Sequence, residues 1–258
     1  MGQQFNQQIQ DHRSIRKYKP KSINSEILTD IITSGIRSST SSNMQFYSII
    51  QTKDSELKEQ LYKAHGEQKM VMQAPVVFTF CCDQRRIKNW MKQSGVDYAG
   101  ENFLGFMRGV IDVCLVAQNM AIAAEAYGIG ICYMGSTLTS ATQISEILNL
   151  PQHVFPVTSL VMGYPDGQSE KVDRLPIEAV LHKEKYQILS EEEIEQLYRQ
   201  REESTFARFK TSGRFGSLIA EKDLKNISQV YTETKFSLDY LSEMATLLLQ
   251  HYKDQGFT

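Results

Sequence analysis

The chain has 258 residues, of which 41% are hydrophobic and 22% charged, and its formal net charge is −2. This composition is typical of a soluble globular protein with one sizeable core or two small ones. The near-neutral charge argues against a general nucleic-acid-binding protein. The opening residues MGQQFNQQIQ lack the apolar segment of a signal peptide, so we expect a cytoplasmic protein.

The first third of the chain alternates helix-like and strand-like segments. Ser25 is placed to cap a helix, Asp54 or Ser55 to cap a second, and Gly66 to end that second one. The continuous apolar run 76–82 is typical of a strand buried on both faces. The charged stretch 83–102 predicts a helix followed by a loop. The predicted helices here are 5–10, 26–36, 55–64 and 68–73, and the predicted strands are 45–52 and 76–82.

The longest apolar segment is 104–127, which contains no proline and is followed by Gly128 and Gly130. Its few polar residues fall on two stripes, with Arg108, Asp112 and Asn119 on one and Gln118 and Glu125 on the other. The remainder is apolar nearly all round, which predicts a buried helix. Such a helix needs a large domain or a second subunit to cover it. A membrane span is the alternative, but the acidic residues make it expensive in lipid.

The second half of the chain continues the same alternation. We expect strands at 131–134 and 155–162, and between them a helix capped by Thr139 or Ser140. Ser190 and Glu193 form a capping-box pattern before an acidic, exposed helix over 190–201. A last helix is predicted from Ser228 or Thr234 to Lys253. Because helices outnumber strands, the chain is predicted to be a single α+β domain over 1–258, with 190–258 as a C-terminal helical arm.

Cysteine and histidine spacing gives no sign of a metal site. The cysteines are Cys81, Cys82, Cys114 and Cys132, all in apolar runs without C-x-x-C spacing. They are predicted to be reduced core residues of a cytoplasmic protein. The five histidines are scattered without metal-ligand spacing.

Two short polar segments carry the chemistry. In His12-Arg13-Ser14-Ile15-Arg16, two guanidiniums and a hydroxyl lie within four residues, which suits a phosphate group. A solvated basic turn is the alternative. The hydroxyl-rich run 38–42 predicts a shaped loop that can lie against a flat ligand, with a flexible linker as the alternative.

Six motifs, in this order, resemble the nitroreductase family. They are HRSIRKY, SSTSSNMQ, APVVF, AAEAYGIGICYMGS, LPQHVFPVTSLVMGYP and RLP. More narrowly they are similar to its oxygen-insensitive NADPH-type branch of nitroreductases and flavin reductases. The similarity covers roughly residues 5–190, and the C-terminal arm is similar only in broad character.

The resemblance implies an FMN-binding homodimer with a mixed central sheet flanked by helices, in which 104–127 packs at the subunit interface. It implies an FMN-dependent NAD(P)H oxidoreductase that reduces a small-molecule electron acceptor such as a nitroaromatic or a quinone by a ping-pong, two-electron mechanism. The flavin does the chemistry, so no catalytic side chain is predicted. A flavin reductase that releases free reduced FMN and a flavin-binding protein without reductase activity are the alternatives.

The family's cofactor contacts can be carried over residue by residue. The phosphate of FMN is assigned to His12, Arg13, Ser14 and Arg16. Thr40, Ser41 and Gln45 are expected to approach the flavin from the partner subunit. Gln68 is assigned to the pyrimidine edge, and the central edge to Tyr133, Met134, Gly135 and Ser136, with the Gly135 N–H directed at the flavin N5. Glycine there lets the backbone approach the ring closely.

One segment departs from the family pattern. The family usually shows Lys-Pro-Arg-Leu-Pro, whereas this chain has Val172-Asp173-Arg174-Leu175-Pro176. Arg174 keeps its place, and Lys171, one residue early, is the candidate substitute for the lysine. A solvated loop lysine is the alternative at that position. Either NADPH or NADH therefore fits the sequence as co-substrate.

Overall fold

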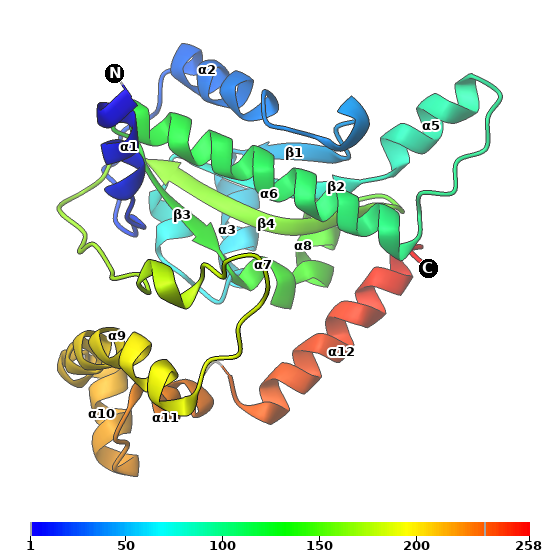
Figure 1. Ribbon diagram of the computed structural model, residues 1–258. Helices are drawn as coiled ribbons and strands as arrows, with labels where there is room; N and C mark the ends of the chain where they lie inside the picture. The colour runs from blue at the N-terminus through cyan, green and yellow to red at the C-terminus, as the bar shows by residue number, and fades with distance from the viewer. Residues whose placement is uncertain (1, 235) are drawn as a thin grey trace. The chain divides into compact units, whose positions relative to one another are not determined.

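The computed structural model describes residues 2–234 and 236–258 (Figure 1). The chain divides into two compact units, residues 2–171 with 246–258, and residues 172–245. The boundary at 172 precedes residue 190, where we expected the arm to begin, and the last residues belong with the first unit. The organisation as one domain with an arm stays a prediction.

The first unit is built on a four-stranded sheet in the order β1-β2-β4-β3. The strands are β1 (Tyr47–Thr52), β2 (Val76–Asp83), β3 (Gly130–Met134) and β4 (Val154–Gly163). The α+β class is confirmed, but all three pairings are antiparallel, where we expected a mixed sheet. The unbroken apolar run of β2 reflects its central position between layers of helices, which buries all of its residues and does not require parallel pairing.

Alternate side chains of β2 enter two different cores. Val76, Phe78 and Phe80 pack with the buried side of α6 (Phe103–Ala126), which crosses one face of the sheet (Figure 1). Val77 belongs to the second core. That core contains residues of α3 (Ser55–Ala64), α4 (Met70–Gln73) and α8 (Ala141–Ile147). The period-two pattern of a strand therefore divides the unit into two helical layers.

Helix α6 is the predicted helix 104–127, shifted by one residue at each end. It can lie close to the sheet because residue 109 is glycine and has no side chain. A Cβ at Gly109 would be 2.3 Å from Cys82 Sγ. Among the described residues it is the one helix long and apolar enough to cross a membrane, and 39% of its most apolar window is buried. Its other face leaves Phe103, Leu104, Ile111 and Leu115 exposed. One chain does not cover it all round.

Three of the four cysteines are buried inside the first unit, and the fourth is exposed. Cys81, Cys82 and Cys132 are buried free thiols, as predicted, and burial raises the pKa of Cys82 to about 12. Cys114 is exposed, so its prediction as a core residue is wrong for this chain alone. It lies on the face of α6 that points away from the sheet, which a uniformly apolar sequence cannot distinguish from the buried face.

Most of the remaining helices of the first unit lie where the sequence predicts them, although α1 begins three residues earlier than expected. They are α1 (Gly2–Gln10), α2 (Ser25–Ile36), α5 (Arg85–Gln93) and a short α7 (Ser136–Thr139) that was not predicted. Asn24, not Ser25, caps α2, since the Asn24 side chain accepts from Glu26 N. Residues 246–254 of α12 (Leu238–Asp254) also belong to this unit. There Tyr252 and Phe257 enter the core beneath α6.

The second unit is helical. Its helices are α9 (Glu191–Thr211), α10 (Gly213–Lys222), α11 (Ile227–Thr232) and the first residues of α12, and a short 3-10 helix covers Ile177–Ala179. The predicted capping box is present: Ser190 N donates to Glu193 Oε2 at 2.7 Å and Glu193 N to Ser190 Oγ at 3.3 Å. Helix α9 continues to Thr211 because no glycine or proline interrupts it before Gly213.

Candidate functional site

The basic motif at 12–16 lies along the β3 edge of the sheet. Ile15 N donates to Ile131 O at 2.8 Å, which adds this segment to the strand. The Ile15 side chain is buried in the second core and fits only because position 130 is glycine: a Cβ there would lie 2.5 Å from Ile15. Alternation along the extended chain then leaves Ser14 and Arg16 on the side opposite Ile15.

The charges of this motif are available to an anion. Neither Arg13 nor Arg16 pairs with a carboxylate within the described residues, and Arg13 Nε donates only to Asp11 O at 3.2 Å. His12 differs, since its Nδ1 lies 2.6 Å from Glu125 Oε1. Arg13 lines a hollow of about 440 Å³ next to Gly130. By the same alternation Arg13 lies on the side of Ile15, where both line this hollow, and Arg16 lies on the side of Ser14. The two guanidiniums therefore flank this edge of the sheet, and its role as a phosphate site stays a prediction.

The turn after β3 brings together residues from separate motifs. Gln68 Nε2 lies 3.2 Å from Ser136 Oγ and also donates to His65 O at 2.9 Å. Met134 is buried, whereas Gly135 at the start of α7 is exposed, and a Cβ there would meet no atom within 4 Å. Tyr133 OH donates to Gln118 Oε1 at 3.3 Å. The backbone at Gly135 therefore faces open space, as close approach of a flat ligand requires.

His65 also belongs to this cluster, although no sequence pattern predicts it as a site residue. Its Nδ1 lies 2.9 Å from Ser136 Oγ, while its Nε2 is buried without a partner. Burial lowers the pKa of His65 to about 4, so the ring is neutral at physiological pH. Only its place at the end of α3, just before Gly66, distinguishes it in sequence, and that signal predicts a helix end rather than a site.

The buried His65 is expected to make stability fall in mild acid. As pH falls below the ordinary histidine pKa of 6.5, the unfolded chain takes up a proton that the folded His65 accepts only near pH 4. Between about pH 7.5 and about pH 5, the wild type is expected to lose about 2 kcal/mol more unfolding free energy than His65→Gln. Urea unfolding at the two pH values measures this. His153 and His251, whose pKa values are also lowered by burial, are common to both proteins. Equal losses would contradict the burial of a neutral His65.

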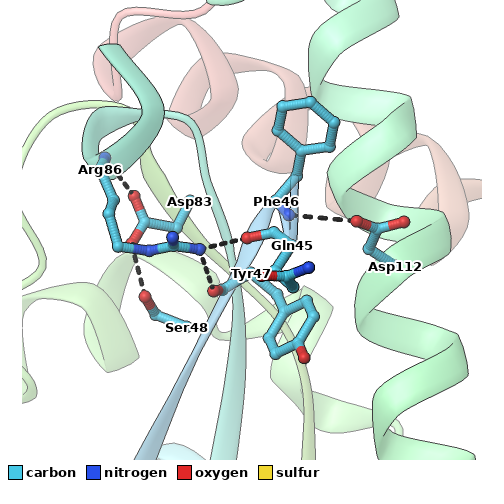
Figure 2. A network of polar contacts seen from close by, with 7 residues as sticks. All are labelled: Gln45, Phe46, Tyr47, Ser48, Asp83, Arg86 and Asp112. Atoms are coloured by element: carbon cyan, nitrogen blue, oxygen red, sulfur yellow. Dashed lines mark hydrogen bonds and ion pairs between the residues drawn. The ribbon is translucent and has the colours of Figure 1, made fainter. Parts of the chain in front are cut away.

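The hydroxyl-rich run forms a shaped loop, as predicted, at the other edge of the sheet. Residues Ser41–Asn43 form a 3-10 helix before β1, with Ser42, Asn43 and Gln45 at positive φ. Asp112 of α6 accepts hydrogen bonds from this loop, and Figure 2 shows its carboxylate facing the backbone N–H of Phe46. The loop is therefore fixed by side-chain contacts and is not a flexible linker.

A single chain does not bring all the predicted site residues together. Thr40, Ser41 and Gln45 precede β1, whereas 12–16 and 133–136 flank β3, and β1 and β3 are the two edges of the sheet. Three strand spacings separate these edges, which is about 14 Å. The two groups of predicted site residues therefore lie at opposite edges of the sheet of one chain.

In the departing segment, Lys171 makes a long-range contact, whereas the hydrogen bonds of Arg174 are local. Lys171 Nζ lies 3.2 Å from Asp11 Oδ1, which places it beside the basic motif. Arg174 belongs to the second unit, and its Nη1 donates to Val172 O at 3.0 Å and to Asp173 O at 3.4 Å.

Comparison with known proteins identifies the family to which this fold belongs. The family model described as "Nitroreductase family" matches residues 9–164. This chain belongs to the nitroreductase family.

Individual relatives agree with that assignment. The chain is 38% identical over 182 residues to the FMN reductase (NADPH) of Bacillus subtilis strain 168, covering 70% of this chain and 73% of that protein. It is 37% identical over 186 residues to a Cr(VI) reductase of Pseudomonas sp. strain G-1, covering 72% and 76%. The structure of the NfrA1 nitroreductase from B. subtilis matches with a TM-score of 0.82 at 29% identity, covering 98% of both chains. The last match extends through the C-terminal helices.

Proposed function

We propose that this protein is an FMN-dependent NAD(P)H oxidoreductase that reduces nitroaromatics, quinones or similar small electrophiles. Two observations on the β3 edge carry the proposal: the guanidiniums of Arg13 and Arg16 have no carboxylate partner among the described residues, and the backbone at Gly135, just after β3, faces open space. The relatives named FMN reductase (NADPH) and Cr(VI) reductase support this assignment.

The residues present fit FMN in charge and in shape. Arg13, Ser14, Arg16 and the free Nε2 side of His12 would hold the phosphate, since charge-assisted donors suit it. The open space at Gly135 admits a ring against backbone, and the Gly135 N–H would orient it. Gln68, held by Ser136 and His65 O, offers its amide oxygen to the ring edge. When bound, FMN would supply the redox chemistry, which is the transfer of two electrons from the nicotinamide to the acceptor.

We also propose that the protein is a homodimer working in the cytoplasm. The exposed apolar face of α6 needs a cover, and a second chain would carry Thr40, Ser41 and Gln45 to the site. The buried free thiols Cys81, Cys82 and Cys132 agree with a reducing compartment.

The activity can be tested directly. Denaturing the purified protein should release FMN, and the native protein should oxidise NADPH with a quinone or nitroaromatic as acceptor. Parallel double-reciprocal plots are expected, because the two substrates use one site in turn. A protein without flavin, or one that oxidises no nicotinamide with any acceptor, would contradict the proposal.

A flavin reductase that releases reduced FMN is the second candidate, favoured by the similarity to the B. subtilis FMN reductase. Turnover of added free FMN distinguishes it. A flavin-binding protein without reductase activity would keep its flavin oxidised when NADPH or NADH is added.

The nicotinamide preference is expected to be weaker for NADPH than is usual in this branch. A 2′-phosphate near Asp173 would be repelled at a cost on the order of 1–4 kcal/mol, and Lys171 already faces Asp11. The values of kcat/KM for NADPH and NADH should therefore be compared in the wild type, in Asp173→Asn and in Asp173→Pro. Both variants should shift toward NADPH. A wild type that already prefers NADPH by about a hundredfold, about 2.7 kcal/mol, would contradict the role of Asp173.

A further inference from the structure

Helix α6 carries one acid that its apolar surroundings do not explain. Asp112 is 1% exposed, and no lysine or arginine of the described residues forms an ion pair with it. A buried, unpaired carboxylate is costly unless hydrogen-bond donors satisfy it. Its donors therefore indicate why a negative charge is kept at this position.

All the donors to Asp112 come from the loop before β1. Thr40 Oγ1 donates to Oδ2 at 2.5 Å and Phe46 N to the same oxygen at 3.1 Å. Ser41 N donates to Oδ1 at 3.1 Å. Both carboxylate oxygens are thus used, and they join the two ends of a loop that contains the positive-φ residues Ser42 and Asn43. Such a backbone persists only when its surroundings hold it.

A second set of contacts holds the strand side of the loop. Arg86 donates to Gln45 O and to Tyr47 O, the latter at 3.2 Å, and Asp83 accepts from Ser48 Oγ at 2.5 Å. Figure 2 shows these groups on the side of β1 opposite Asp112. The loop is therefore fixed between α6 on one side and the end of β2 with the first turn of α5 on the other.

The hydroxyl of Thr40 already makes its hydrogen bonds within the loop and with Asp112. It donates its proton to Asp112 and accepts from Gln45 N at 2.9 Å, so it has no proton left for a ligand. The Ser41 hydroxyl and the Gln45 amide oxygen have no partner among the described residues. These two groups, unlike Thr40, remain free to meet a ligand.

We propose that Asp112 is a positioning residue of the FMN site, which fixes residues 40–46 so that Ser41 and Gln45 meet the cofactor of the partner subunit. Thr40 acts through Asp112 and does not touch the cofactor. This assignment rests on the proposed function. It also explains the acid within the apolar interface helix: the same element that faces the second chain fixes the loop that reaches into that chain's site.

The test measures FMN affinity of the dimer in five variants. Asp112→Asn leaves one acceptor oxygen where the carboxylate offers two, and Thr40→Val removes the hydroxyl. Each is expected to raise the FMN Kd about tenfold. Thr40→Ser keeps the hydroxyl and should stay within about twofold of wild type. The double variant Asp112→Asn/Thr40→Val should have an FMN Kd no higher than that of the single variant with the higher Kd. Free-energy effects of residues in one hydrogen-bond network do not add. Ser145→Ala, which removes a buried hydrogen bond to His251 Nε2 at 2.9 Å, is the stability control and should leave the Kd unchanged.

Hydrogen exchange of the same proteins gives a readout that does not depend on flavin. The amides of Ser41 and Phe46 should exchange faster in Asp112→Asn and in Thr40→Val than in wild type, and not faster in Ser145→Ala. If Asp112→Asn fails to fold, the comparison of Thr40→Val with Thr40→Ser tests the proposal by both the FMN Kd and hydrogen exchange. An unchanged Kd, multiplicative effects in the double variant, or an equal loss in Ser145→Ala would overturn the proposal. A wild type that binds no FMN would instead defeat the proposed function, and hydrogen exchange would then still decide whether Asp112 fixes the loop.

Discussion

Replacing Arg13 and Arg16 together by alanine is expected to abolish retention of FMN through purification. Each guanidinium would contribute a charge-assisted hydrogen bond to the phosphate, worth about 1.5–3 kcal/mol. Each single variant should thus lose about tenfold to a hundredfold in affinity, and the double variant more. The fold should be kept, because neither guanidinium pairs with a carboxylate in the part of the chain that the structure describes.

Fluorescence titration of the apo-protein with FMN measures this loss. Arg37→Ala, an exposed arginine at the end of α2, is the matched control and should bind like wild type. Riboflavin, which lacks the phosphate, should bind wild type and the double variant about equally. Wild-type FMN affinity in the double variant would contradict the assignment of 12–16 as the phosphate site.

Charging the exposed face of α6 is expected to dissociate the protein and release its flavin. Ile111 is 54% exposed and Leu115 40% exposed in the single chain. If this face is the subunit interface, Ile111→Glu/Leu115→Glu buries two unpaired carboxylates, which costs several kcal/mol. Monomers would then lack the partner's Ser41 and Gln45, so FMN content should fall together with the dimer.

Sedimentation velocity together with the flavin-to-protein ratio tests this prediction. Leu57→Glu changes an exposed leucine of α3, on the opposite side of the sheet from α6, and should leave both quantities unchanged. A double-glutamate variant that remains a flavin-bound dimer would show that the interface lies elsewhere. A well-folded wild-type monomer would exclude the dimer itself.

Local patterns predicted the elements but not their partners. The apolar run of β2 and the long segment of α6 are recognisable because burial on both faces leaves a continuous signal along the chain. The antiparallel pairing and the exposure of Cys114 depend on which neighbour lies against each face. That information is absent from periodicity.

In the candidate site, too, the sequence predicts what is local and not which distant residues meet. The motif at 12–16 was found because its charges are adjacent in sequence, and the resemblance to a family supplied the rest. His65 and Asp112 were not assigned roles, because their partners Ser136 and Thr40 are 71 and 72 residues away. A single buried histidine, or one acid on an apolar helix, has no local signature of function.

Anaerobic titration of the purified protein with NADPH, followed by its absorption spectrum, tests the central claim most directly. The protein should be yellow, and its flavin band should bleach in proportion to NADPH up to one equivalent per bound flavin. A quinone or a nitroaromatic added afterwards should restore the band. A colourless protein, or a flavin band that neither NADPH nor NADH bleaches, would contradict the assignment of this chain as an FMN-dependent NAD(P)H oxidoreductase.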